Sequence, residues 1–294
     1  MRLLRNRIEI KTPDQVRLMR RAGLVVADVH AALREAVRPG VTTGELDAVC
    51  AATIERAGAR SNFKGYYDYP ATVCISVNEE VVHGIPGERV LHKGDLVTFD
   101  CGACVLDESG TEWHGDAAFT TVVGGRYASN ADRVLDATTR RALWAAIAAL
   151  ARALAGDASG RAGRINTVGD TVEDVVAEAC RDYDVSLGIL EDYVGHGIGT
   201  AMHMEPDVLN YSVRRRGARL RPGMVLAVEP MLTAGEPEVE ELDDGWTVVT
   251  ADGSRAAQWE HTVALVPGGV WVLTASDGGV EGLDPYGIEP RPLR

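Results

Sequence analysis

Residues 93–100 read KGDLVTFD and residues 222–229 read PGMVLAVE, and this internal repeat decides the fold that we expect. In both segments a turn glycine precedes a hydrophobic strand, and an acid stands six residues after that glycine. A second acid follows in each half, within WHGD at 113–116 and within QWE at 258–260. Each half therefore predicts a pair of strands that carries two acids. The alternative to an internal repeat is that the two short segments resemble each other by chance.

Helical patterns precede the strands in both halves. In the first half we expect a helix at 13–37, which ends before Pro39-Gly40, and a second helix at 44–57, capped by Thr43. In the second half we expect helices at about 129–155 and 168–182. The strand-like runs cover 71–77, 95–102 and 117–125 in the first half, and 224–232, 246–250 and 258–266 in the second.

Repetition of this kind indicates a duplicated unit whose halves pack into one pseudo-symmetric domain. We expect an N-terminal segment at 1–12 and a single catalytic domain at 13–275. The pseudo-repeats of that domain cover about 13–125 and 126–275. A tail at 276–294, rich in glycine and proline, predicts irregular surface structure.

Composition excludes several classes of function. The net charge of −13 repels phosphate backbones, so no DNA partner is expected. Five cysteines, an odd number spread thinly, suit a reducing compartment better than a disulfide framework. The N-terminus lacks the apolar core of a signal peptide, and the apolar run at 142–156 is too short to span a bilayer. These features predict a cytoplasmic protein with no membrane contact.

The four acids of the repeated strands are the strongest sign of chemistry. Asp100 and Glu229 end very apolar strands, where a lone carboxylate would carry a large desolvation cost. With Asp116 and Glu260 on facing hairpins, four carboxylates would surround one point, and they cannot all stay ionised without cations between them. For any one acid, pairing with an arginine is the simpler explanation. The four together favour a metal site.

Histidines offer the remaining ligands. The segment VGHGIGTAMHMEP at 194–206 places His196 and His203 seven residues apart, among glycines that let the backbone approach a site closely. It lacks the i,i+4 pairing of a helical zinc motif, but it can supply one ligand and one catalytic imidazole. His83 stands in a similar context, VVHGIPGE.

The other histidines are set aside. We interpret His30 and His92 as structural or solvated. We leave His114 and His261 out of the ligand set, because neighbouring residues of a strand point to opposite faces.

The donor set also decides the kind of metal. Oxygen-rich ligation with one imidazole suits Mn²⁺, Fe²⁺ or Co²⁺ better than a thiolate-type zinc site, and four carboxylates are enough to hold two ions. The pair Cys101-x-x-Cys104 is interpreted as strand composition, because no second thiolate pair accompanies it and a hairpin strand is the wrong setting for a redox motif. The acids that follow Cys104 are expected to face solvent at a hairpin tip.

These motifs resemble those of a known family. They are DCG at 100–102, HGDAA at 114–118, GHGIG-x-x-x-H-x-EP at 195–206, VEPM at 228–231 and WEHT at 259–262. In this order they resemble type I methionine aminopeptidases, metallopeptidases of the pita-bread fold, and the resemblance runs from about Ile10 to Leu273. It implies an α+β fold in which two pseudo-symmetric helix-helix-hairpin halves form a curved, mostly antiparallel sheet with helices on its outer face.

The resemblance also implies a reaction. It is removal of the N-terminal methionine from nascent polypeptides, favouring a small second residue, by a hydroxide that bridges two divalent ions such as Co²⁺, Mn²⁺ or Fe²⁺. The implied metal ligands are Asp100, Asp116, His196, Glu229 and Glu260. Asp116 and Glu260 would bridge the ions, Asp100 would complete one ion, and His196 with Glu229 would complete the other.

The same resemblance gives further roles. Glu229 would shuttle the proton, His203 would stabilise the oxyanion, and His83 would bond the scissile amide nitrogen. The methionine pocket maps to Phe63, Tyr66, Tyr69, Cys74, Met202 and Trp246, any of which could instead be plain core. The protein is expected to be a monomer.

Some positions depart from the family pattern. Phe63 stands where bacterial relatives often carry cysteine, Met202 where an aromatic residue is common, and Met204 where an acid is frequent. The interval from Asp100 to Asp116 is also about five residues longer than usual. We assign the excess to a hairpin tip at 107–111, where insertions are tolerated.

Other functions stay open at this point. A proline-specific relative, a prolidase or Xaa-Pro aminopeptidase, usually carries an additional N-terminal domain, whereas the first catalytic helix here begins near residue 13. A metal-free binding module would have lost ligands, whereas all five candidate positions hold competent side chains.

One basic cluster stands out in this acidic chain. It consists of Arg214, Arg215, Arg216, Arg219 and Arg221. A solvated loop is the simpler interpretation, and a contact with ribosomal RNA is the sharper one.

Overall fold

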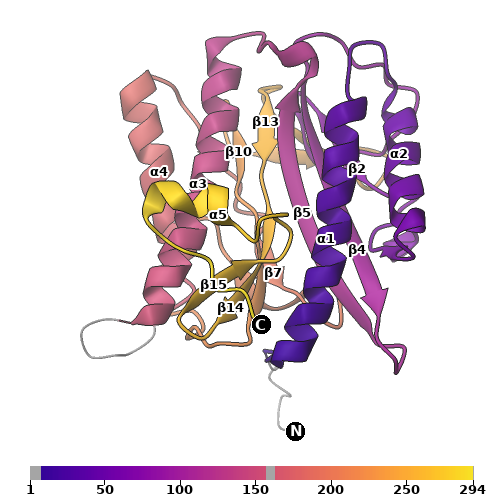
Figure 1. Cartoon of the computed structure of the whole chain (residues 1–294). Coiled ribbons are helices and arrows are strands. Elements are labelled where there is room, and N and C mark those ends of the chain that lie inside the picture. The colour runs from indigo at the N-terminus through magenta and orange to yellow at the C-terminus, as the bar shows by residue number, and fades with distance from the viewer. Residues whose placement is uncertain (1–7, 157–162, 294) are drawn as a thin grey trace, which may run out of the picture.

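The computed structural model describes residues 8–156 and 163–293, and Figure 1 shows its helices arranged around the strands. The helices are α1 (Pro13–Ala36), α2 (Thr43–Arg56), α3 (Asn130–Ala155), α4 (Thr167–Tyr183) and α5 (Val280–Leu283). Of the N-terminal segment expected at 1–12, residues 1–7 lie outside the described part.

The strands are short except for two. They are β1 (Arg60–Ser61), β2 (Cys74–Val77), β3 (Glu80–Val82), β4 (Leu96–Leu106), β5 (Glu112–Val122), β6 (Gly188–Ile189), β7 (Gly195–Gly197), β8 (Met204–Val208), β9 (Val225–Val228), β10 (Met231–Thr233), β11 (Val239–Glu241), β12 (Val248–Thr250), β13 (Ala256–Gln258), β14 (His261–Val266) and β15 (Gly269–Val272).

Capping residues fix where the first helices begin. The side chain of Thr12 accepts a hydrogen bond from the amide of Gln15 at the start of α1, and Gln15 bonds back to the amide of Thr12. The same reciprocal pair, Thr42 with Glu45, begins α2. The expected cap Thr43 was therefore wrong by one residue, because Thr42 supplies the accepting oxygen and Thr43 is the first helical residue.

The first half is built on a long hairpin. Strands β4 and β5 pair antiparallel along their whole length, while β1 and β2 pair with the other edge of β4. The hairpin is longer than the expected strands at 95–102 and 117–125, because only 107–111 are polar enough to turn. As a result Asp116 lies within β5, opposite Gly102 of β4, rather than before the strand.

In the second half two expected strands are each broken in two. The run 224–232 divides into β9 and β10 around Glu229-Pro230, because proline has no amide hydrogen to donate to a ladder. The run 258–266 divides into β13 and β14 around Trp259-Glu260. Both acids therefore stand at a break between strands.

The second half otherwise forms one larger sheet and two small ones. The larger sheet has the order β15-β14-β9-β7-β8, with neighbours antiparallel. The other two sheets have three strands each, in the orders β13-β10-β6 and β11-β12-β3. Strand β3 comes from the first half, so the third sheet joins the two halves.

Helices cover each half separately, as Figure 1 shows: α1 and α2 lie on one side, and α3 and α4 on the other. The apolar faces of α1 and α2 share one buried cluster with β2, β4 and β5, and those of α3 and α4 share another with β9 and β14. The halves are bonded to each other where β5 meets β14. The amide of Asp116 donates to Thr262 Oγ1 at 2.9 Å, and the amide of Glu260 donates to the carbonyl of Ala118 at 2.9 Å.

The tail differs from the irregular structure expected for it. Helix α5 and the turn Asp284–Tyr286 pack on α3, where Leu283 is fully buried. Gly282 permits this contact, since a Cβ at that position would lie 2.3 Å from the ring of Trp144. Within the described residues, no helix is both long and apolar enough to cross a membrane.

Candidate active site

Four carboxylates from four chain segments meet at the bottom of one cavity of about 220 Å³. Asp100 lies in the middle of β4, and Asp116 lies in the paired strand β5. Glu229 follows β9, and Glu260 precedes β14. The strand breaks at the last two positions free their side chains from the sheet and aim them into the cavity.

These carboxylates are poorly compensated by the rest of the protein. Asp116 is 4% exposed and Glu260 2% exposed, yet Asp116 Oδ1, Glu260 Oε1 and Asp100 Oδ1 are buried without a hydrogen-bond partner. Burial raises the pKa of Asp100 to about 7. Burial, together with the other carboxylates of the group, raises the pKa of Asp116, Glu229 and Glu260 well above the usual range. Such a group requires protons or cations between its members.

His196 completes a set of donors suited to a metal ion. Its Nδ1 donates to the carbonyl of Gly197 at 3.0 Å, which leaves Nε2 as the nitrogen with a free lone pair. Nε2 lies 3.5 Å from Glu229 Oε1. Ligand atoms of His196, Asp116 and Glu260 all lie within 4.8 Å of one another. Burial lowers the pKa of His196 to about 3, so its imidazole is neutral at neutral pH.

Gln258 belongs to this site and was missed in the sequence. Its Nε2 donates to Glu229 Oε2 at 3.3 Å, and its Oε1 is buried without a partner. Gln258 stands two residues before Glu260, at the end of β13. Alternation along QWE was the available signal, because residues two apart in a strand share a face.

Two further histidines face the same cavity from its sides. Tyr66 and His203 are joined by a 2.9 Å hydrogen bond between the tyrosine hydroxyl and Nδ1. Burial lowers the pKa of His203, so the ring is neutral at neutral pH. A neutral ring that accepts from Tyr66 at Nδ1 carries its hydrogen on Nε2, where it can serve as a donor.

His83 occupies a strained position directly after β3. Its φ of +61° lies in the left-handed region, which is uncommon for residues other than glycine and clusters at functional sites. The ring lies edge-on to Tyr193 and Trp246, with centroids 5.5 Å and 6.1 Å away. Burial, and secondarily His203, lowers the pKa of His83 to about 4.

Apolar and aromatic side chains form the rest of the cavity. Its lining includes every pocket residue expected from the sequence: Phe63, Tyr66, Tyr69, Cys74, Met202 and Trp246. Tyr69 anchors this wall, with its ring 5.0 Å from Trp246 and its hydroxyl donating to the carbonyl of Gly84. Met231 and Tyr193 also line the cavity and were missed in the sequence.

The residues left out of the ligand set lie outside this cavity. His261 is half-buried and is not among the residues that line the cavity; it is bonded to Thr274 Oγ1, and its ring lies 5.0 Å from that of Trp144. His30 packs on Phe119 in the core. His114 lies two residues before Asp116 and so shares its face of β5; it stays out of the cavity because it lies further along the hairpin. Strand alternation therefore does not keep His114 out of the cavity, contrary to expectation; its position along the hairpin does.

The two cysteines of the C-x-x-C pair lie on opposite faces of β4. Cys101 points into the core, where its sulfur lies 3.6 Å from that of Cys50. Cys104 points away from that core, toward His114 of β5. The pair therefore cannot act together as a dithiol or as a joint metal clamp.

Comparison with known proteins agrees with this geometry. A fold with antiparallel sheets covered by helices, and a cavity floored by four carboxylates and one imidazole, define a metal-dependent hydrolase of the pita-bread type. The model of metallopeptidase family M24 matches residues 17–267. The chain belongs to that family, and within it to the methionine aminopeptidases.

Curated relatives support the finer grouping. Methionine aminopeptidase 1 of Mycobacterium tuberculosis is 45% identical over 90% of this chain and 94% of its own length. Methionine aminopeptidase 1 of Bacillus subtilis is 39% identical over 90% of this chain and 98% of its own.

Solved structures give the same grouping. The methionine aminopeptidase of Thermotoga maritima superposes with a TM-score of 0.82 at 34% identity, over 92% of this chain and 100% of that one. The prolidase of Pyrococcus furiosus reaches a TM-score of 0.65 at 19% identity, over 91% of this chain and 65% of that one, and it shares the fold alone. The expected fold class is confirmed.

Proposed function

We propose that the chain is a metal-dependent aminopeptidase that removes the N-terminal methionine of nascent proteins and peptides with a small second residue. The observation that carries this proposal is that one cavity combines a set of metal-ligand side chains with an apolar binding surface. Four carboxylates line it together with an imidazole, Asp116 and Glu260 being buried and Asp100 and Glu229 half-buried, and an apolar, aromatic wall with a thioether lies beside them. We infer the substrate from the methionine aminopeptidases to which the chain is similar.

The residues present fit divalent ions. Three buried carboxylate oxygens without hydrogen-bond partners and the free Nε2 of His196 form an oxygen-rich donor set with one nitrogen. We assign Asp100, Asp116, His196, Glu229 and Glu260 as the residues that would hold such ions. Ions held there would supply Lewis-acid polarisation of a carbonyl and a water of lowered pKa.

The side chains around this floor would do the rest of the work. Glu229, whose Oε2 accepts a hydrogen bond from Gln258 Nε2, would transfer a proton to the departing amine. His203, with its hydrogen on Nε2, would donate to the oxyanion that develops on the scissile carbonyl. His83, held by its backbone at the cavity wall, would bond the scissile amide nitrogen.

The apolar wall would select the first residue of the substrate. Phe63, Tyr69 and Trp246 form a rigid aromatic surface, and Met202 adds a soft, adaptable one. Apolar pockets distinguish side chains that differ by one methylene by only about 1–3 kcal/mol. We therefore infer good rather than absolute selectivity for methionine.

A peptide competition tests the proposed activity against its nearest rival. Equal concentrations of Met-Ala-Ser and an Xaa-Pro peptide are offered to enzyme purified without oxygen and reconstituted with Mn²⁺, Fe²⁺ or Co²⁺. We expect release of methionine and little cleavage before proline. Preference for the Xaa-Pro peptide would assign the chain to the proline-specific members of the fold. Absence of both activity and bound metal would favour a binding module.

Metal analysis of the same preparation tests the ligand assignment. We expect two divalent ions at the carboxylate site in the native protein and fewer in Asp116→Ala. Full metal content in that variant would contradict its role as a ligand. The ion that gives the highest turnover under anaerobic conditions identifies the metal that the enzyme uses.

Delivery to the ribosome is a separate question. Arg214, Arg215 and Arg216 are exposed in the segment between β8 and β9, and Arg219 and Arg221 follow them. We propose that this cluster contacts ribosomal RNA in the cytoplasm, where chains emerge. Charge reversal of the arginines should reduce co-sedimentation with ribosomes and leave cleavage of Met-Ala-Ser unchanged. Unchanged co-sedimentation would reject the contact.

A further inference from the structure

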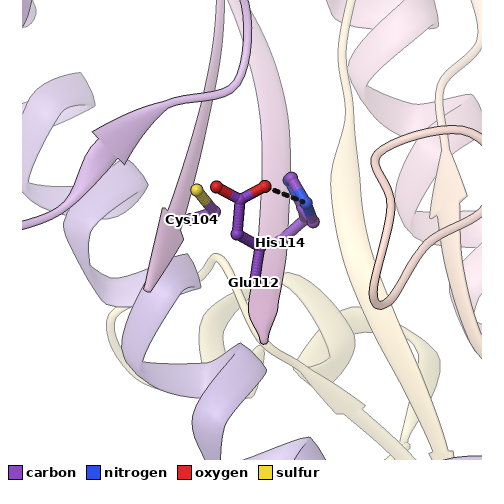
Figure 2. Close-up of side chains that lie close together, drawn as sticks. All are labelled: Cys104, Glu112 and His114. Carbon is purple, nitrogen blue, oxygen red and sulfur yellow. Dashed lines mark ion pairs between the residues drawn. The ribbon is translucent and has the colours of Figure 1, made fainter. Parts of the chain in front are cut away.

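A second group of metal-binding side chains lies on the same hairpin, nearer its tip (Figure 2). Cys104 of β4 is paired directly with His114 of β5, and Glu112 stands two residues before His114. Cross-strand partners and residues two apart share a face of a sheet, so the three side chains point to the same side. The thiol, the imidazole nitrogen and a carboxylate oxygen lie within 4.8 Å of one another.

The imidazole of His114 is held in the form that a metal ion requires. Asn62 Nδ2 donates to the carbonyl of Gly115 at 3.1 Å, which turns Asn62 Oδ1 toward His114. That oxygen can only accept, so His114 Nδ1, 2.8 Å away, carries the hydrogen. Nε2 is left with a free lone pair that faces Glu112. Ligand histidines in proteins are usually fixed in this way by a bond at the other ring nitrogen.

The carboxylate of Glu112 is shared between two neighbours. Its Oε1 bonds Arg60 at 3.2 Å, while Oε2 lies 3.8 Å from His114 Nε2. The Nε2 lone pair and Oε2 are both acceptors, and a cation between them would satisfy both. Glu112 is half-exposed, so its side chain can move the short distance needed to close ligand separations of up to 4.8 Å to the roughly 3.5 Å of a tetrahedral site.

We propose that Cys104, Glu112 and His114 form a mononuclear site for a borderline-soft divalent ion of the Zn²⁺ class, separate from the carboxylate centre. One thiolate, one imidazole and one carboxylate are the donor types that select Zn²⁺ over Mg²⁺, Ca²⁺ or Mn²⁺. Three protein ligands leave a fourth position for water. The surface cavity that the three side chains line is open to solvent and supplies room for that water.

The two metal sites share no ligand, but they are physically connected. His114 and Asp116 are two residues apart on β5. Tyr66 and Met202 line both cavities. An ion at the hairpin site would join β4 to β5 between the carboxylate centre and the lengthened tip, and would brace this shared wall.

Metal stoichiometry tests the proposal on the full-length holoenzyme. The wild type and Cys104→Ser are dialysed against Zn²⁺, and bound metal is measured per chain. We expect one equivalent fewer in Cys104→Ser, while the ions of the carboxylate centre and cleavage of Met-Ala-Ser are retained. Glu112→Gln, at a half-exposed position, should lose the same equivalent.

Spectroscopy with Co²⁺ identifies the ligand directly. A thiolate bound to Co²⁺ gives a near-ultraviolet charge-transfer band that carboxylate and imidazole ligands do not give. We expect this band in the wild type and its loss in Cys104→Ser. The matched control is Cys74→Ser, because Cys74 lines the carboxylate cavity and is the other thiol near a metal. Equal metal content in all proteins, no band in the wild type, or a band lost only in Cys74→Ser would overturn the proposal.

Discussion

Asp116 and Glu260 lie 144 positions apart in the sequence, but hydrogen bonds join Asp116 to a residue of β14 and Glu260 to a residue of β5 in the fold. Their backbones are fixed by hydrogen bonds to Thr262 and Ala118, so the two carboxylates are held side by side without any contribution from a metal. Because the ligands are already ordered, less conformational entropy is lost when an ion binds. Placing two carboxylates together in a buried position is unfavourable for the folded protein, as the raised pKa values of both groups indicate.

His203 allows a role in catalysis to be separated from a role in metal binding. If its Nε2–H stabilises the oxyanion, His203→Ala should lower turnover by about 10²–10³-fold with the metal content unchanged, the range found for loss of one such donor. Tyr66→Phe should give a smaller decrease, because it removes only the hydrogen bond that fixes the ring. Steady-state kinetics with metal analysis make the test. Loss of metal from His203→Ala would instead identify this histidine as a ligand.

The hairpin β4–β5 carries residues of both proposed metal sites, and the side chain of one acid, Asp107, orders its tip. The carboxylate of Asp107 accepts from the hydroxyl and amide of Ser109, from the amide of Thr111 and from Trp113 Nε1 at 3.0 Å. The additional residues that the sequence places at this tip therefore form an ordered turn rather than a loose insertion. The acids of the tip were expected to face solvent, but Glu112 is only half-exposed and turns back toward His114.

The turn predicts a pH dependence. Hydrogen bonds from Ser109, Trp113 and Thr111 lower the pKa of Asp107 to about 2. A depressed pKa stabilises the fold above the unfolded pKa of about 3.9, and this stabilisation is lost as the pH falls toward 2. An NMR titration should place the Asp107 midpoint near 2, and Asp107→Asn should unfold more easily at neutral pH. Glu108→Gln, on the same turn, is the matched control. A midpoint near 4 would mean that these hydrogen bonds do not stabilise the ionised carboxylate.

Pattern and motif predicted much of the molecule. The repeat of glycine, apolar strand and acid located Asp100 and Glu229, because that signal is local. The breaks at Glu229-Pro230 and Trp259-Glu260, the role of Gln258, and the contact of Asn62 with His114 depend on segments distant in sequence, which no local pattern encodes. The helical tail was missed for a similar reason, since α5 is stabilised by Trp144 rather than by its own sequence.

Metal ions should also stabilise the molecule as a whole. The carboxylate centre is formed by residues of both halves, so an ion bound there favours the assembled fold over the unfolded chain. At a free concentration of 100 times Kd, binding adds about 2.7 kcal/mol to the free energy of unfolding, or several degrees in Tm. Chelation should therefore lower the Tm of the wild type, measured by calorimetry, and change that of Glu260→Ala much less. Equal decreases in both would contradict a shared centre.

The most direct measurement of the central claim is the rate of methionine release from Met-Ala-Ser by metal-reconstituted wild type and Glu260→Ala, assayed side by side. We expect rapid release by the wild type and loss of activity in the variant, with circular dichroism showing that both are folded. Release at similar rates, or no release by the wild type with any of Mn²⁺, Fe²⁺ and Co²⁺, would contradict that claim.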